Sequence, residues 1–167
     1  MATNTVLDIL IVEDEMNSYL LAQKIKQEFS DSVKIHSNGH GLLDDIEPFK
    51  NLDIIIVDQN YVKEDMVHTL KEVRKESPNT EVIVLSRETE IRFAENIRDA
   101  GAYDYIGKDD NATDKILNDL KVFWSDRKLQ KENVLQNSVI KRSPGVIEII
   151  ALSILALTEL VVYVLAK

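Results

Sequence analysis

The 167-residue sequence has no cysteine, which excludes a disulfide framework and any thiolate chemistry. Basic residues are also scarce: 20 lysines and arginines stand against 29 aspartates and glutamates, and the net charge is −9. The part after residue 140 holds three basic and two acidic residues, so residues 1–140 alone carry −10. Because so acidic a domain repels phosphate backbones, we expect no nucleic-acid binding.

Other common functional signals are missing as well. The sequence contains no glycine-rich phosphate loop and no Ser/His/Asp grouping. Its three histidines, His36, His40 and His68, lack the spacing of metal ligands, so we expect them to be surface or core residues. The N-terminal residues show no basic stretch followed by an apolar one, so we expect no signal peptide.

Short apolar segments rich in β-branched residues alternate with segments of helical pattern. The predicted strands are Leu7–Val12, Val33–His36, Ile54–Val57, Val82–Leu85 and Tyr105–Ile106. The predicted helices are Asn17–Phe29, Gly41–Ile46, Asp65–Glu76, Thr89–Ala100 and a long one from Ala112 towards Gln136. Continuously apolar strands are typical of a sheet that is covered on both faces. The alternation therefore predicts an α/β fold with an open, doubly wound, five-stranded parallel sheet.

Polar side chains gather where the predicted strands end. Glu13 and Asp14 follow the first strand, and Asp58 follows the third. Ser86 follows the fourth strand, and Lys108 follows the fifth. Ligands of open parallel sheets bind at the carboxyl ends of the strands, and in the usual order the first and third strands are neighbours. Three carboxylates would then meet in one crevice, where they repel each other unless a cation compensates them.

A hard divalent cation with oxygen ligands resolves this repulsion. Mg²⁺ fits best, because it binds a few carboxylates and keeps waters free for a phosphate. An aspartate carboxylate can itself act as a nucleophile that accepts a phosphoryl group. Lys108 and the hydroxyl of Ser86 would stabilise the charge on the phosphoryl oxygens. These residues predict a site that accepts a phosphoryl group rather than a conventional enzyme.

On these residues the sequence resembles the receiver domain of two-component response regulators, over about residues 6–125. Glu13 and Asp14 match the acidic pair of that family, and Asp58 matches its phosphoacceptor. Ser86 matches its Ser/Thr hydroxyl, and Lys108 matches its signature lysine. The stretches "NGHGLL", "SPNTEVIVLS" and "DAGAYDYIGK" are similar to the family's loop into the second helix and to the approaches to its fourth and fifth strands.

The resemblance implies a flavodoxin-like fold with strand order 2-1-3-4-5. It implies that Mg²⁺ is bound by Asp14, Asp58 and the main-chain carbonyl of Asn60, with Glu13 acting through a water. It also implies that a histidine kinase or a phosphotransfer protein donates the phosphoryl group to Asp58.

Three further positions carry roles that the resemblance implies. Tyr105, three residues before the lysine, occupies the position of the family's switch aromatic, and half-buried core is an equally good interpretation of it. Asn60 and Glu88 occupy positions that tune the lifetime of the acyl phosphate in the family.

The sequence departs from the family pattern around the site. Tyr61 and Val62 replace the usual Met-Pro, Arg87 replaces a small residue after the hydroxyl, and Asp109 replaces the proline after the lysine. None of these changes removes a reacting group. We expect these changes to affect the rate of phosphorylation and the switching movement of the family.

The C-terminal part differs in composition from the predicted receiver domain at 1–125. Residues 126–145 are mostly polar, and we interpret them as a spacer helix and linker rather than a signalling coiled coil, because sustained heptads are missing. Residues 146–166 are 21 residues with two charges, Glu148 and Glu159, and as a helix they would span about 31 Å at ~1.5 Å per residue. This length predicts a transmembrane helix that anchors a cytoplasmic receiver. The alternative is a hydrophobic helix packed in an oligomer or under a partner protein.

The sequence as a whole predicts a phosphorylatable receiver without a DNA-binding output domain. It would signal by protein–protein contact beside Tyr105, and a homodimer is one candidate assembly. The rival is a pseudo-receiver, a scaffold that ignores phosphate and assembles through its C-terminal helices. An aspartyl-phosphate phosphatase of the haloacid dehalogenase type fits poorly, because that family has a second acid two residues after its nucleophile, where this chain has Asn60.

Overall fold

The computed structural model describes residues 6–29, 33–37, 52–62, 65–88, 90–142, 145, 148, 152–155 and 157–158. The chain divides into two compact units, residues 1–124 and residues 125–167, which are described separately here. The predicted helix Gly41–Ile46 lies outside the described residues.

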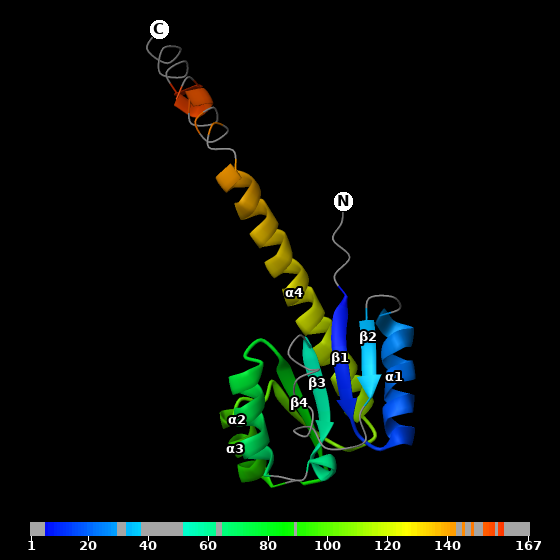
Figure 1. The fold of residues 1–167 in the computed structure, drawn as a ribbon. Helices are drawn as coiled ribbons and strands as arrows, with labels where there is room; N and C mark the ends of the chain where they lie inside the picture. Colours follow the sequence, from blue (N-terminus) through cyan, green and yellow to red (C-terminus); the bar gives the residue numbers. More distant parts are fainter. Residues whose placement is uncertain are drawn as a thin grey trace. The chain divides into compact units, whose positions relative to one another are not determined.

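The first unit contains a five-stranded sheet (Figure 1). Its strands are β1 (Leu7–Val12), β2 (Val33–Ser37), β3 (Ile54–Asp58), β4 (Glu81–Ser86) and β5 (Asp104–Gly107). All neighbouring strands are parallel, and their order is β2-β1-β3-β4-β5. The predicted fold class and strand order are confirmed, and each observed strand contains the predicted one.

The α-helices of the described residues are α1 (Glu15–Phe29), α2 (Met66–Glu76), α3 (Ile91–Asp99) and α4 (Ala112–Arg142). Each overlaps a predicted helix. A short 3-10 helix, η3 (Gln59–Tyr61), directly follows β3. The helix α4 begins where it was predicted, and its described residues continue to Arg142.

Side chains of alternating strand residues form a core on each face of the sheet. Ile9 and Ile11 of β1 point to one core, where they join residues of α1 and α4 such as Ile25 and Leu120. Leu10 belongs to the second core, with residues of α2 and α3. The central strands are thus buried on both faces, which is why their sequences are continuously apolar and β-branched. This packing holds the carboxyl ends of the strands in fixed positions.

Two carboxyl groups face each other between β5 and α4. Burial, together with the neighbouring carboxylate of Asp104, raises the pKa of Asp119 to about 6. Oδ2 of Asp119 is buried and has no hydrogen-bond donor among the described residues. Asp104 also pairs with Arg98, Nη2 to Oδ1 at 2.9 Å. The ionised form of Asp119 is therefore unfavourable in the folded protein.

The variant Asp119→Asn is expected to raise the free energy of unfolding at pH 7.5 by about 1 kcal/mol, after allowance for solvent screening of a half-exposed group. The pKa of Asp119 is higher in the folded than in the unfolded chain, so the folded state binds more protons between about pH 4 and 6. The wild-type protein therefore loses stability as the pH rises through 6, and the gain from asparagine disappears near pH 4. Urea unfolding of the wild type and the variant at pH 7.5 and near pH 4 measures this difference in the free energy of unfolding. The exposed acid Asp126, changed to asparagine, serves as the control, and an equal response of both variants would exclude the carboxyl pair.

In the second unit, helix α4 carries exposed apolar side chains, with Leu129 57% and Val134 67% exposed. The described residues of the predicted membrane segment, 148, 152–155 and 157–158, are helical and exposed. No helix in the described part of the chain is both long and apolar enough to cross a bilayer, so the structure gives the predicted transmembrane helix no support. Most of that segment, at 146–166, lies outside the described residues.

Candidate functional site

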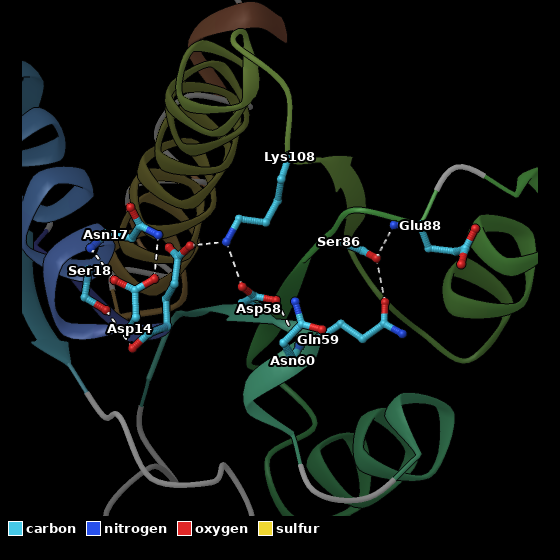
Figure 2. A network of polar contacts seen from close by, with 10 residues as sticks. Asp14, Asn17, Ser18, Asp58, Gln59, Asn60, Ser86, Glu88 and Lys108 are labelled. Atoms are coloured by element: carbon cyan, nitrogen blue, oxygen red, sulfur yellow. Dashed lines mark hydrogen bonds and ion pairs between the residues drawn. The ribbon is translucent and has the colours of Figure 1, made fainter.

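The carboxyl edge of the sheet brings together side chains from four strand ends (Figure 2). Glu13 follows β1, Asp58 ends β3, Ser86 ends β4, and Lys108 follows β5. Glu13 is 4% exposed, and Asp58 and Ser86 are each 3% exposed. The register pairs Asp58 with Leu85 and Ser86 with Gly107, so the strands end side by side. These polar groups are therefore held at one edge by the packing of the sheet.

Lys108 connects the two buried carboxylates of this edge. Its Nζ donates a hydrogen bond to Oδ2 of Asp58 at 2.7 Å and another to Oε1 of Glu13. Burial lowers the pKa of Lys108, but the hydrogen bonds to Asp58 and Glu13 and their charges outweigh burial, so the pKa is raised above its usual value. Lys108 thus stays a cation, and a single ammonium faces two carboxylates.

The backbone orients the carboxylate of Asp58. Its Oδ1 accepts a hydrogen bond from the main-chain N–H of Asn60 at 2.9 Å, which makes Asp58 the N-cap of η3. Its Oδ2 faces Lys108. Both oxygens are therefore fixed by donors, an arrangement that orients a carboxylate for attack on an electrophile.

Asp14 is turned towards its own helix. Its Oδ1 accepts a hydrogen bond from the main-chain N–H of Asn17 at 2.9 Å, at the start of α1 (Figure 2). Ser18 donates to the main-chain carbonyl of Glu13 at 3.2 Å, which fixes the same turn. Local capping therefore engages the carboxylate that the sequence predicts as a metal ligand.

The donors at this edge have the chemistry of a hard-cation site. Glu13 and Asp58 present buried carboxylate oxygens, and Lys108 is the cation that pairs with both of them in the described part of the chain. Mg²⁺ fits a site of oxygen ligands in which the carboxylates outnumber the nearby cations. Among the described residues, no group of three acidic or histidine side chains is arranged to hold a metal ion. The carboxylate of Asp14 accepts the main-chain N–H of Asn17 at the start of α1.

A chain of hydrogen bonds leads away from Ser86. Its hydroxyl donates to Oε1 of Gln59 at 2.6 Å and accepts from the main-chain N–H of Glu88 at 2.9 Å (Figure 2). The main-chain carbonyl of Glu88 in turn accepts from the hydroxyl of Tyr105 at 2.6 Å. The ring of Tyr105 is half-buried and packs edge-on against Phe93, with ring centroids 5.9 Å apart. Tyr105 thus contributes to the core and contacts the loop after β4, and its role as a switch stays a prediction.

Sequence reasoning missed Gln59 and Asn17. Gln59 directly follows the candidate nucleophile, but no pattern reveals that its amide reaches Ser86. Asn17 was detectable, since an aspartate three residues before a helical N–H is a common N-cap arrangement. Arg87, at the position expected to be small, is exposed.

The histidines show no sign of a metal site in the described part of the chain. His36 pairs with Asp8 at 2.6 Å, and His68 is exposed on α2. His40 lies outside the described residues.

A groove of about 560 Å³ lies beside the site, between α1 and the first turns of α4. Apolar side chains form part of its wall, among them Leu20, Leu21 and Ile116. Glu13 and Lys108 line one end of the groove, so it opens onto the polar edge of the sheet.

Comparison with known proteins agrees with this geometry. Residues 9–121 match the sequence model of the response regulator receiver domain family. The transcriptional regulatory protein ZraR of Salmonella typhimurium is 26% identical over 102 residues, which cover 61% of this chain and 23% of ZraR. ZraR of Escherichia coli K12 is 24% identical over 106 residues, 64% of this chain and 24% of ZraR. The chain thus spans about a quarter of the length of the curated relatives that it matches.

Solved structures show the same fold. A LuxR-family DNA-binding response regulator from Staphylococcus aureus superimposes with a TM-score of 0.60 at 20% identity, covering 71% of this chain and 99% of the other. A response regulator from Thermotoga maritima gives a TM-score of 0.58 at 22% identity, covering 72% and 98%. A pilus assembly-related protein from Burkholderia pseudomallei gives 0.59 at only 10% identity, covering 73% and 91%.

Proposed function

Because this chain belongs to the response regulator receiver family, we propose that it accepts a phosphoryl group on Asp58 and signals through the state of that residue. The observation that carries the proposal is the contact of Lys108 with Asp58 at 2.7 Å, in a buried edge where four strand ends meet. The donor would be a phosphorylated histidine on a kinase or phosphotransfer protein.

The chain's own groups support the transfer step. An oxygen of Asp58 attacks phosphorus, and the new O–P bond forms as the P–N bond of the phosphohistidine breaks. The electron pair of that bond leaves with the histidine nitrogen. Lys108, already within hydrogen-bond distance of Asp58, neutralises negative charge on the phosphoryl oxygens. Ser86 would donate its hydroxyl proton to one of these oxygens.

Mg²⁺ is the cofactor that the donor set fits. Asp14, Asp58 and the main-chain carbonyl of Asn60 would hold it, with Glu13 acting through a water. When bound, it supplies further positive charge against the phosphoryl oxygens. Asp14 also accepts a hydrogen bond from the N–H of Asn17, and its remaining lone pairs would be the ones that bind the ion.

The proposal is tested by incubating the full chain with Mg²⁺ and acetyl phosphate and measuring its intact mass. We expect the mass of one phosphoryl group to be added, to be lost rapidly in base as an acyl phosphate is, and to be absent when EDTA removes Mg²⁺. A chain that gains no mass with Mg²⁺ present would support the scaffold instead.

The scaffold is the second candidate, and one observation favours it. Lys108 already compensates Glu13 and Asp58, and Asp14 is engaged in capping, so this edge is stable without phosphate. A pseudo-receiver would keep this arrangement permanently. Its amide NMR spectrum would be the same with and without a phosphodonor.

The output that we propose is a protein–protein contact beside Tyr105, on the surface of α3, β5 and α4. Asn60 and Glu88 would tune the lifetime of the acyl phosphate, since Asn60 contacts Asp58 and Glu88 contacts Ser86. The activities of the longer relatives are properties of those proteins.

Anchorage of the receiver to a membrane by residues 146–166 remains a proposal from the sequence alone. An alkaline wash of membranes separates its two interpretations. An integral anchor keeps the full chain in the pellet, whereas a helix packed against protein releases it.

A further inference from the structure

Gln59 holds the hydroxyl proton that the proposed reaction needs. Ser86 donates this proton to Oε1 of Gln59 at 2.6 Å, a short and well-formed hydrogen bond. Ser86 is 3% exposed, so water does not compete freely for it. Gln59 itself belongs to η3, directly after Asp58, and its side chain is half-buried.

A serine hydroxyl has one proton to donate. While Ser86 donates to Gln59, it cannot donate to a phosphoryl oxygen on Asp58. The two hydrogen bonds are mutually exclusive, and one has to break before the other forms. One oxygen lone pair of Ser86 is engaged as well, because Glu88 N–H donates to that oxygen at 2.9 Å.

The same hydroxyl is linked to the surface through main-chain atoms. Glu88 contacts Ser86 with its N–H and Tyr105 with its carbonyl, the latter at 2.6 Å. The hydroxyls of Ser86 and Tyr105 are therefore both hydrogen-bonded to the main chain of Glu88. A contact made inside the site thereby reaches a side chain at the surface.

On these contacts we propose that Gln59 is a positioning residue that acts as a latch. It stabilises the phosphate-free arrangement by accepting the Ser86 proton, and its release accompanies phosphorylation of Asp58. The inference rests on the proposed function and adds to it a residue, Gln59, that opposes activation without contacting the phosphoryl group.

The experiment titrates the full chain with beryllofluoride, a mimic of the phosphoryl group, in the presence of Mg²⁺. Amide NMR signals of Ser86 and Glu88 report its binding. The variant Gln59→Met removes the acceptor and keeps the length of the side chain. We expect Gln59→Met to lower the half-saturating beryllofluoride concentration about fivefold. This factor corresponds to the net free energy of one neutral hydrogen bond, which the variant no longer has to break. Gln27→Met, an exposed position on α1, is the control and should leave that concentration unchanged.

A second pair of variants separates a latch from a general packing effect. In a Ser86→Ala background no hydroxyl is present, so the further change Gln59→Met should alter nothing. A fivefold effect that persists without Ser86 would overturn the latch, and so would unchanged affinity in Gln59→Met alone.

The same titration distinguishes the latch from the phosphoacceptor proposal. If the wild-type chain binds beryllofluoride but Gln59→Met binds it no better, the latch alone fails. If neither protein binds it, both proposals fail. Binding by Gln59→Met when the wild type does not bind would support the latch in its strongest form.

Discussion

The variant Lys108→Met is expected to lower the free energy of unfolding at pH 7.5 by about 3 kcal/mol. Glu13 and Asp58 are 4% and 3% exposed, and Lys108 is the cation that faces both. Without it, two buried carboxylates remain beside each other without compensation. Methionine keeps the length and apolar contacts of the lysine stem, so the loss reports the charge. Urea unfolding of the full chain measures it.

The effect of Mg²⁺ on this loss identifies its cause. Added Mg²⁺ should restore part of the lost stability, because a cation that binds only the folded chain, at the uncompensated carboxylates, stabilises it. The exposed pair Lys115–Asp109, at 2.8 Å, provides the matched control, and Lys115→Met should leave the free energy of unfolding nearly unchanged. Equal stability of Lys108→Met and the wild type would show that water already solvates Glu13 and Asp58.

The same variant should be phosphorylated about a hundredfold more slowly by acetyl phosphate. The ammonium of Lys108 is placed 2.7 Å from Oδ2 of Asp58 before the reaction, so it opposes the charge on the phosphoryl oxygens without reorganisation. Lys108→Arg keeps the charge but not the compact geometry, and its rate should fall between the two.

Initial rates from intact mass, under conditions where each variant is folded, measure this effect. Lys115→Met again serves as the control for loss of a lysine near the same loop. A rate for Lys108→Met within a few-fold of the wild-type rate would mean that Lys108 stabilises the fold and takes no part in the transfer.

The fold was predictable because its causes are local and repeated. Strands such as Ile54–Asp58 are apolar at every position except the last, which only a sheet covered on both faces explains. The same rule predicted where Glu13, Asp58, Ser86 and Lys108 would lie, because carboxyl ends of parallel strands share one edge.

The detailed contacts of the site were not predictable, because they depend on competition between acceptors and donors at close range. The sequence predicts that the carboxylate of Asp14 lies in the shared crevice, but in the structure it accepts a hydrogen bond from the N–H of Asn17. Gln59 reaches Ser86 through rotamers that no sequence pattern encodes. The raised pKa of Asp119 likewise arises from a contact with Asp104 on another element. Such contacts depend on how side chains from different elements are placed in space.

The central claim is that Asp58 itself carries the phosphoryl group. Reduction of the labelled full chain with borohydride converts an aspartyl phosphate to homoserine, and peptide mass spectrometry then shows which residue was converted. We predict conversion at residue 58 in the wild type and none anywhere in Asp58→Asn. Conversion at Asp14 or another acid, or equal labelling of Asp58→Asn, would contradict the account.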